Sequence, residues 1–234
     1  SARTIILQKR SGNTPSGKRP RQARTLTVRA RPGKPTQGLL TIDGLVFGCA
    51  LGPAGIRALK REGDGATPRA IMRVLTVFYR SDRQRAGIGP VHLPTAPIRP
   101  DLGWCDAPAD ANYNRPVRLP YPGSHEKMWR ADRLYNVCIV LDWNILPRRR
   151  RRGSAIFLHV ARPGMEPTEG CIAVSPRTMA RLLPLLTRNS RVVVYELPCH
   201  HSYTFAADER GIAPVCGPGS PNSRHTHTIR SIFN

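Results

Sequence analysis

The sequence predicts a mainly β domain with one or a few short helices. Short runs rich in Val, Ile, Leu and Phe recur along the chain, and each is bounded by Gly, Pro, Asn or Asp. Asp43-Gly44 separates two of these runs, which is a strong signal for a β-hairpin. Only one segment shows convincing helical periodicity. With 234 residues, 40% of them apolar, the chain is long enough for one domain with a substantial core.

Taken in chain order, the apolar runs predict strands at 39–42, 45–51, 71–79, 136–142, 155–160, 172–174 and 191–197. A helix is predicted after the sixth run, where Ser175 is a suitable cap and Pro176 suits the first turn. Its apolar positions recur at helical spacing as far as Asn189, namely Met179, Leu182, Leu183 and Leu186. Residues 90–133 are rich in Pro and Gly, so we expect long ordered loops there, where binding sites often lie.

The charge of the chain is strongly positive and unevenly distributed. Lys and Arg number 37 against 15 Asp and Glu, a formal net charge of +22, which favours a polyanionic partner. Residues 1–36 contain basic residues but no acidic one, and we interpret them as an extended N-terminal extension. Residues 148–152 are five consecutive arginines, which a loop would expose to solvent. Residues 198–234, rich in His, Pro and Gly, are interpreted as a C-terminal extension.

Several function classes find no support in the sequence. With three Trp, six Tyr and five Phe, the chain offers little for stacking on bases, and no motif predicts specific nucleic-acid binding. We expect no transmembrane segment, because no apolar run is long enough, and no signal peptide is visible. The six cysteines are spread singly, so no metal site or cofactor is predicted, and the histidines at 200, 201, 225 and 227 lack spaced carboxylates. Cys49 and Cys138 lie in apolar strands and are expected in the core, whereas Cys199 and Cys216 are either bridged or free.

One returning loop carries the candidate chemistry. His159 lies at the end of an apolar strand, and Gly170-Cys171 closes the loop that follows. A thiol with an ordinary pKa of about 8.5 needs a neighbouring imidazole or oriented amides to become nucleophilic at neutral pH. Gly170 permits a tight turn, and the amides near it and Cys171 are suited to hold an oxyanion. The spacing alone is equally compatible with a structural His and an inert core Cys.

The segment around this loop resembles the L,D-transpeptidase catalytic domain (YkuD-like) family. The family signature is a strand-borne His, a loop and a [Ser/Thr]-x-Gly-Cys element, which Thr168, Gly170 and Cys171 match. Residues 60–68, KREGDGATP, resemble the Lys-x-Glu-Gly-Asp-x-x-Thr-Pro element of a proteobacterial branch. Further segments that look like that branch are Trp104-Cys-Asp106, Tyr113-Asn114, Tyr135-Asn136 and 153–159. The resemblance implies a β-sandwich or barrel catalytic domain at 37–197.

The resemblance also implies a mechanism and a substrate. Cys171 is then the nucleophile that forms a thioester with a peptidoglycan stem peptide, and His159 is its base. The Val160 carbonyl orients the imidazole, while Gly170, Thr168 and Glu169 shape the turn. Many relatives have His where this chain has Glu169, so this side chain either binds an amine or is an exposed loop acid. The substrate-binding residues implied are Lys60, Trp104, Asp106, Tyr113, Asn114 and Tyr135. An equally good interpretation of Lys60, with Glu62 and Asp64, is that they only hold a turn together.

The family resemblance predicts a peptidyltransferase on the periplasmic or wall-facing side of the envelope, with donor and acceptor stem peptides as partners. A carboxypeptidase or cross-link hydrolase on the same scaffold is an alternative, because water can replace the acceptor amine. A basic protein that binds polyanions and has a vestigial site is a further alternative. The arginines at 148–152 are then expected to act at long range on the anionic wall rather than on the reacting atoms. Oligomeric state and cross-link type stay open.

Overall fold

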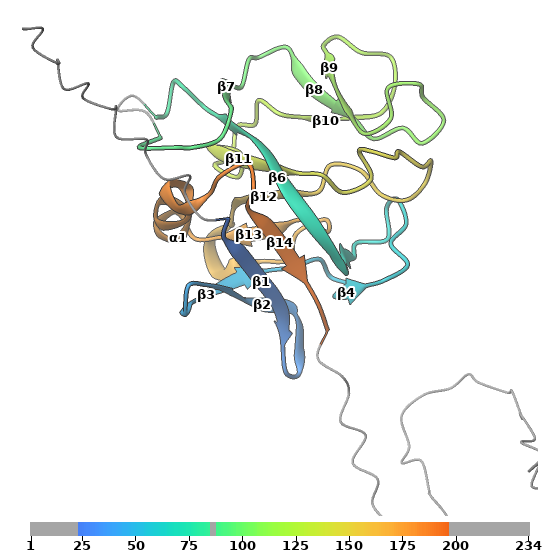
Figure 1. Ribbon diagram of the computed structural model, residues 1–234. Coiled ribbons are helices and arrows are strands. Elements are labelled where there is room, and N and C mark those ends of the chain that lie inside the picture. The colour runs from blue at the N-terminus through green and yellow to red at the C-terminus, as the bar shows by residue number, and fades with distance from the viewer. Residues whose placement is uncertain (1–22, 85–87, 197–234) are drawn as a thin grey trace, which may run out of the picture. The chain divides into compact units, whose positions relative to one another are not determined.

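The computed structural model describes residues 23–84 and 88–196, and most of its regular elements are strands (Figure 1). In chain order the elements are β1 (Thr25–Arg31), β2 (Lys34–Ile42), β3 (Leu45–Ala50), β4 (Ile56–Arg57), β5 (Thr67–Pro68), β6 (Ala70–Tyr79), β7 (Thr95–Pro97), β8 (Leu102–Cys105), β9 (Arg115–Arg118), β10 (His125–Lys127), β11 (Val137–Leu141), β12 (Phe157–Val160), the 3-10 turn η1 (Pro163–Met165), β13 (Ile172–Val174), α1 (Pro176–Leu182), the 3-10 turn η2 (Leu183–Leu185) and β14 (Arg191–Val194). The predicted mainly β fold with short helices is confirmed. The predicted extension at 198–234, with its cysteines and histidines, lies outside the described residues.

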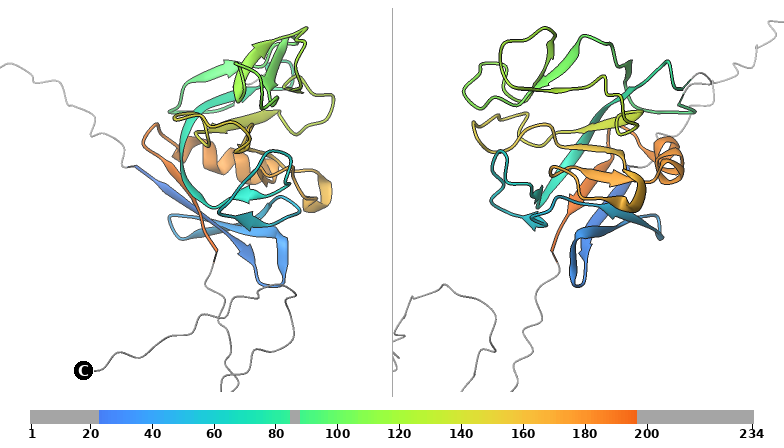
Figure 2. Two further views of the ribbon diagram at one scale, coloured as in Figure 1. Left: turned by 90° about the vertical axis from the view of Figure 1, so that its right-hand side faces the viewer. Right: turned by 180° about the vertical axis from the view of Figure 1, so that it is seen from behind.

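The main sheet closes into a barrel. Within the described residues it has nine strands in the order β11-β12-β13-β3-β2-β1-β14-β6-β7, and β11 also pairs with β6 (Figures 1 and 2). The pairs β1–β14, β12–β13 and β6–β7 are parallel, and the other pairs of this sheet are antiparallel. Aliphatic side chains from alternate strand positions, together with α1, form the main core.

The β2–β3 hairpin follows the sequence signal closely. Ile42 pairs with Leu45, so Asp43 and Gly44 form the two-residue turn. Both turn residues have positive φ, 47° and 78°, as the favoured hairpin turns require. Arg24 forms an ion pair with Asp43, which ties the turn to the start of the described chain.

The N-terminal boundary differs from the prediction. Residues 25–36, assigned to a basic extension, form β1 and the beginning of β2. β1 lies between β2 and β14, and its Leu26 and Val28 side chains are fully buried in the barrel. Thr and Arg alternate with the apolar residues of β1, which marks a half-buried strand, and the high local charge concealed that pattern. The domain therefore begins before residue 37.

The segment 90–133 also contains more regular structure than predicted. β8, β9 and β10 form a separate three-stranded sheet in the order β10-β8-β9, and β7 joins the main sheet beside β6. Figure 2 shows this small sheet on the β11 side of the barrel. These strands have only three or four residues each, and β7, β8 and β9 each contain a Pro or a Gly, so their apolar pattern is too short to read from sequence.

The predicted helix begins as expected but ends earlier. Ser175 accepts a hydrogen bond from the Thr178 amide at 3.1 Å, which confirms it as the N-cap. α1 ends at Leu182 and continues as the 3-10 turn η2, since Pro184 has no N–H to donate to a longer helix. In the described residues, no helix is long and apolar enough to cross a membrane.

Strands β11, β12 and β13 separate two apolar regions. Ile139, Leu158 and Ile172 face the barrel core, whereas Phe157 and Cys171 belong to a second cluster on the opposite face. The small sheet contributes to this second cluster, and the loop before β11 covers it. Cys49 and Cys138 are 1% and 0% exposed, which confirms both as core residues. The second face is where the candidate nucleophile lies.

We predict that Leu26→Ala lowers the free energy of unfolding by about 3 kcal/mol, because it removes a fully buried side chain from β1. The matched control is Leu45→Ala in β3, whose side chain is 41% exposed and whose cost is expected below about 1 kcal/mol. Urea unfolding followed by circular dichroism measures both values. Equal small losses in the two variants would contradict the placement of β1 in the barrel.

Candidate active site

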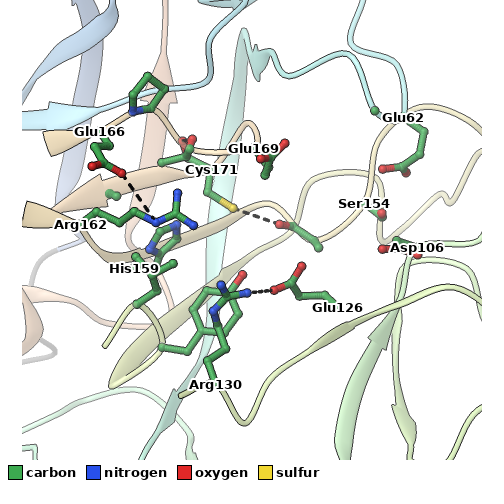
Figure 3. A pocket seen from close by; sticks show the side chains of 17 residues that line it. Glu62, Asp106, Glu126, Arg130, Ser154, His159, Arg162, Glu166, Glu169 and Cys171 are labelled. Carbon is green, nitrogen blue, oxygen red and sulfur yellow. Dashed lines mark hydrogen bonds and ion pairs between the residues drawn. The ribbon is translucent and has the colours of Figure 1, made fainter. Parts of the chain in front are cut away.

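The parallel pairing of β12 with β13 brings the candidate imidazole and thiol to one face. Leu158 pairs with Ile172 and His159 pairs with Ala173, so Cys171 lies one position before the ladder, opposite Phe157. Residues in register on parallel strands share a face. His159 and Cys171 are both buried and both line the same cavity (Figure 3).

The backbone fixes the tautomer of His159. Its Nδ1 lies 2.8 Å from the Val160 carbonyl oxygen, and a carbonyl only accepts, so Nδ1 carries the hydrogen and Nε2 has the free lone pair. Burial lowers the pKa of His159 to about 4; the Val160 bond opposes this shift, and the charges of Arg130 and Arg162 add to it. The imidazole is therefore a neutral acceptor at neutral pH.

Cys171 is held as a neutral thiol. Its Sγ lies 3.1 Å from the Ala155 carbonyl oxygen, to which it donates, and accepts the Phe157 amide at 3.3 Å (Figure 3). Burial raises the pKa of Cys171 to about 12, although the Phe157 amide opposes the shift. The thiol hydrogen thus points to the Ala155 carbonyl in the free protein, and both groups of the candidate pair are uncharged.

The turn before Cys171 requires glycine. Gly170 has φ +117°, and a Cβ there would stand 2.5 Å from the Ala66 carbonyl oxygen. Thr168 closes the same turn, because its hydroxyl donates to the Cys171 carbonyl at 2.7 Å and accepts the Gly170 amide at 3.1 Å. The Thr168 amide in turn donates to the Leu51 carbonyl. These contacts hold the backbone of Gly170 and Cys171 in place, and thereby the position of the thiol.

The Lys-x-Glu-Gly-Asp element supports this turn from the other side. Lys60 is buried and donates to Asp64 Oδ1 at 2.5 Å and to the Arg61 carbonyl at 2.9 Å. Asp64 also accepts the amides of Arg61 and Ala66, so it organises a tight loop. That loop presents the Ala66 carbonyl to Gly170. The positive charge of Lys60 lowers the pKa of Cys171, against the effect of burial.

Aromatic side chains pack edge to face beside the pair. Tyr135 meets His159 at a centroid distance of 5.4 Å and Phe157 at 5.9 Å. Trp104 meets the other side of Phe157 at 5.2 Å. Arg130 stands over the Tyr135 ring, with its Cζ 5.3 Å from the centroid. This row fixes the orientation of the imidazole in addition to the Val160 hydrogen bond.

A cavity of about 380 Å³ opens over the pair. Figure 3 shows Cys171 near its middle, with Arg162 and Glu166 toward one end and Glu62, Ser154 and Asp106 toward the other. Glu169 is exposed and contributes to the wall. The complete lining is Glu62, Gly63, Asp106, Glu126, Arg130, Leu134, Tyr135, Ser154, Ala155, His159, Arg162, Glu166, Pro167, Thr168, Glu169, Cys171 and Ala173. A soft nucleophile and a neutral base thus share one ligand-sized space.

The sequence matches the L,D-transpeptidase catalytic domain family over residues 22–194. The chain belongs to this family. Among solved structures it is similar to L,D-transpeptidase 1 of Mycobacterium tuberculosis, with 13% identity, a TM-score of 0.32, and coverage of 73% of this chain and 62% of that chain. It is also similar to an L,D-transpeptidase from Mycobacterium smegmatis, with 14% identity, a TM-score of 0.36, and coverage of 74% and 59%. The matched part spans less than two thirds of either mycobacterial chain, and a comparison with curated proteins gave no match.

Four residues predicted to touch substrate do not line the cavity of this L,D-transpeptidase domain. They are buried beneath it, namely Lys60, Trp104, Tyr113 and Asn114. Asn114 accepts the Trp104 indole N–H and the Ala155 amide, both at 3.0 Å, and donates to two backbone carbonyls of the loop at 143–144. Their polar groups are used in framework bonds, so we correct the role of Trp104, Tyr113 and Asn114 from contact to support, and Lys60 takes the turn-forming role that was its alternative interpretation. Asp106 and Tyr135 do line the cavity.

The wall of the L,D-transpeptidase cavity includes charged residues that the sequence pattern did not indicate. Arg130 bonds Glu126 at 2.5 Å and Asp132 at 2.7 Å, and Arg162 lies 4.0 Å from Glu166. Each is a common surface residue type in a segment without periodic structure. The only available signal for Arg162 was its position three residues after His159 in the returning loop.

The arginine run at 148–152 is partly ordered by the framework. Arg148 donates to the Tyr113 carbonyl at 2.8 Å and to the Ala111 carbonyl at 3.0 Å. The Arg151 carbonyl accepts the Glu62 amide, and the Arg152 carbonyl accepts the Trp143 indole. None of the five lines the cavity, as expected, but the segment braces the loops around it rather than being merely solvated.

We predict that Gly170→Ala lowers the free energy of unfolding by more than about 2 kcal/mol and slows alkylation of Cys171, because its Cβ would meet the Ala66 carbonyl. The matched control is Gly164→Ala in the same loop, where φ is also positive, +74°, but the space is open. It should cost about 1 kcal/mol. Thermal unfolding and iodoacetamide labelling measure both effects, and equal costs would contradict the close packing of the turn.

The pH dependence of the thiol provides a second test. Because burial raises the pKa of Cys171 to about 12, we predict that its alkylation rate rises about tenfold per unit between about pH 6 and pH 9, without a plateau. Intact mass measurement follows the reaction, and Cys171→Ser gives the background from other thiols. A plateau below about pH 8 would instead indicate a thiolate–imidazolium pair and overturn the neutral assignment.

Proposed function

We propose that the chain is a peptidoglycan L,D-transpeptidase that cross-links stem peptides through a thioester on Cys171. The observation that carries the proposal is the placement of Cys171 and His159 on one face of adjacent parallel strands, inside one cavity. Family membership supports the same activity. A vestigial site on a polyanion-binding protein is disfavoured, because such a protein has no need for the strained Gly170 turn or the fixed imidazole tautomer.

The first half of the proposed reaction forms the acyl-enzyme. The thiol hydrogen passes from Sγ of Cys171 to Nε2 of His159 as the sulfur attacks the carbonyl carbon that follows an L-centre of the donor stem. The Gly170 amide is already donated to Thr168, so we assign the oxyanion to the Cys171 amide. The tetrahedral intermediate then expels the terminal D-amino acid, whose amine takes the hydrogen from the imidazolium.

The second half transfers the acyl group. An amine of the acceptor stem attacks the thioester carbon and gives a hydrogen to His159, and the C–S bond breaks. The departing sulfur regains the hydrogen, which restores the neutral pair. Water in place of the amine would give hydrolysis, the activity of a carboxypeptidase or cross-link hydrolase on the same scaffold. No side-chain carboxylate is needed behind His159, because the Val160 carbonyl orients it.

The pKa values of the free protein limit when the thiolate forms. A thiol with a pKa of about 12 beside an imidazole with a pKa of about 4 strongly disfavours charge separation in the empty site. A bound substrate carbonyl accepts the developing charge directly, so proton transfer accompanies attack instead of preceding it. We assign substrate contact in the cavity to Asp106 and Tyr135, and we place Glu169 on the side from which substrate enters.

The proposal also covers where the protein acts in the cell and how its charge attracts the wall polymer. A peptidoglycan substrate requires the periplasmic or wall-facing side of the envelope. The net charge of +22 would attract carboxylate-rich wall polymer in a salt-sensitive manner, and residues 148–152 contribute to it from outside the cavity. The cross-link type and the branch of the family are not part of the proposal.

We predict that Cys171→Ala and His159→Gln each lower product formation from disaccharide-peptide monomers at least about a thousandfold, because they remove the nucleophile and its base. Cys49→Ala, which alters another buried cysteine, is the control and should keep most activity. Mass analysis of the products distinguishes dimers, trimmed monomers and unchanged substrate. Dimers support the transpeptidase, trimmed monomers alone support the hydrolase, and turnover by Cys171→Ala would contradict the mechanism.

A carbapenem offers a substrate-independent test of the same thiol. The family reacts with some β-lactams through its cysteine, so we predict a covalent adduct on Cys171 that is lost in Cys171→Ala. Peptide mapping locates the adduct. An adduct on Cys105 or Cys138 would show that the nucleophile is a different thiol.

A further inference from the structure

The charge of the cavity is opposite to the charge of the chain. Its lining includes five carboxylates and two arginines, whereas the whole chain carries a net charge of +22. The arginines are matched at one end, where Arg130 pairs with Glu126 and Arg162 lies near Glu166. The other end, which holds Glu62 and Asp106, has no Lys or Arg ion-paired to it among the described residues (Figure 3).

Two buried oxygens at this acidic end accept no hydrogen bond within the described chain. They are Asp106 Oδ1 and Ser154 Oγ, and Ser154 is only 7% exposed. Both residues line the cavity, and Figure 3 shows them close together with Glu62 on the same side of Cys171. Burying a polar atom without a partner costs about 1–3 kcal/mol, which the fold recovers only when something else supplies the bond.

The nearby cations and donors are already used elsewhere. Lys60 donates to Asp64 and to a backbone carbonyl, and the Tyr113 hydroxyl donates to Glu62. With its hydrogen given to Glu62, Tyr113 has none left for Ser154, and its oxygen can only accept from the Ser154 hydroxyl, so Ser154 Oγ still receives no donor. The acidic end therefore presents two carboxylates without a cation, and two of its buried oxygens, Asp106 Oδ1 and Ser154 Oγ, still lack a hydrogen-bond donor.

The framework holds these acceptors in place before any ligand arrives. The Glu62 amide donates to the Arg151 carbonyl, and the Asp106 amide donates to the Ser124 carbonyl. Ser154 precedes Ala155, whose amide is fixed by Asn114 at 3.0 Å and whose carbonyl accepts the Cys171 thiol. The acceptors are thus attached to the same backbone segment that positions the nucleophile.

We propose that Glu62, Asp106 and Ser154 form a subsite for a primary ammonium group of the peptide substrate. An ammonium has three hydrogens and one positive charge, which suit two carboxylates without a cation and the two buried oxygens, Asp106 Oδ1 and Ser154 Oγ, that still lack a donor. The inference rests on the proposed function and adds the chemical class that the acidic end selects. The ammonium belongs either to a side chain of the donor stem or to the acceptor stem, and the two sources are distinguished by the step that they affect.

The test uses the full chain and two donor tetrapeptides that differ only at one side-chain amine, free in one and acetylated in the other. Acyl-enzyme formation is followed by intact mass without acceptor, and transfer is followed with a separate amine acceptor. The variants are Asp106→Asn, which keeps shape and removes charge, and Ser154→Ala, which removes the unpartnered hydroxyl. Glu196→Gln, at an exposed position paired with Arg69, is the control for an equal change in net charge.

If the donor carries the ammonium, acetylation raises the KM for acylation roughly tenfold in the wild type, and Asp106→Asn removes most of that preference. If the acceptor carries it, acylation is unaffected, and Asp106→Asn raises the KM for the acceptor roughly tenfold with a smaller effect on kcat. Ser154→Ala should change the same step in the same direction, and Glu196→Gln should behave as the wild type.

The inference is overturned if the wild type accepts both donors equally and neither Asp106→Asn nor Ser154→Ala changes the KM for donor or acceptor. The proposed function would stand in that case, because acylation of Cys171 is still observed. Failure of the wild type to form an acyl-enzyme with any stem peptide is a different result, which removes the proposed function and the inference with it.

Discussion

The parallel register between β12 and β13 is the constraint on which the rest of the site depends. It sets Cys171 opposite Phe157 and His159 opposite Ala173, so both reactive side chains face the second apolar cluster instead of the barrel core. A shift by one residue would turn them to the other face. The barrel fixes that register, because β12 also pairs with β11, and β13 also pairs with β3. The loop between the two strands then only has to bring Cys171 close to His159. The Gly170 turn, which packs against Ala66, does this.

The burial that follows from this register also keeps Cys171 and His159 uncharged. Removing a thiolate or an imidazolium from water is unfavourable, so the pKa of Cys171 rises to about 12 and that of His159 falls to about 4. A neutral thiol is protected from oxidants, which attack the thiolate form. On the proposed mechanism, reactivity would come from the substrate, whose carbonyl would be the first acceptor for the developing charge. Burial would then account both for the neutral pair and for the dependence of reactivity on substrate.

The sequence predicted seven strands of the main sheet (β2, β3, β6 and β11 to β14), the hairpin at Asp43-Gly44, and the loop that joins His159 to Cys171, because each has a local pattern of period or turn residues. The predictions that were wrong also have physical causes. β1 was concealed by arginines on its solvent side, and β8 to β10 are too short to show a period. Trp104, Tyr113 and Asn114 were expected to touch substrate because polar and aromatic residues in loops often bind ligands. Whether such a side chain faces a cavity or a neighbouring loop depends on tertiary contacts, and Asn114 uses its amide on the backbone beneath the cavity.

The positive surface and the acidic cavity can both act on one substrate, because their charges act over different distances. Exposed cations on the surface act across water, where salt limits their reach to about 8–10 Å, and they raise the local concentration of an anionic polymer without selecting one chemical group. Inside the cavity the effective dielectric constant is lower, so on our proposal the two carboxylates without cation partners would favour a cationic group over a neutral one at contact distance. A wall polymer with both carboxylates and amines would meet these two fields in sequence. The positive exterior would concentrate the polymer, and the acidic end beside Cys171 would select the amine.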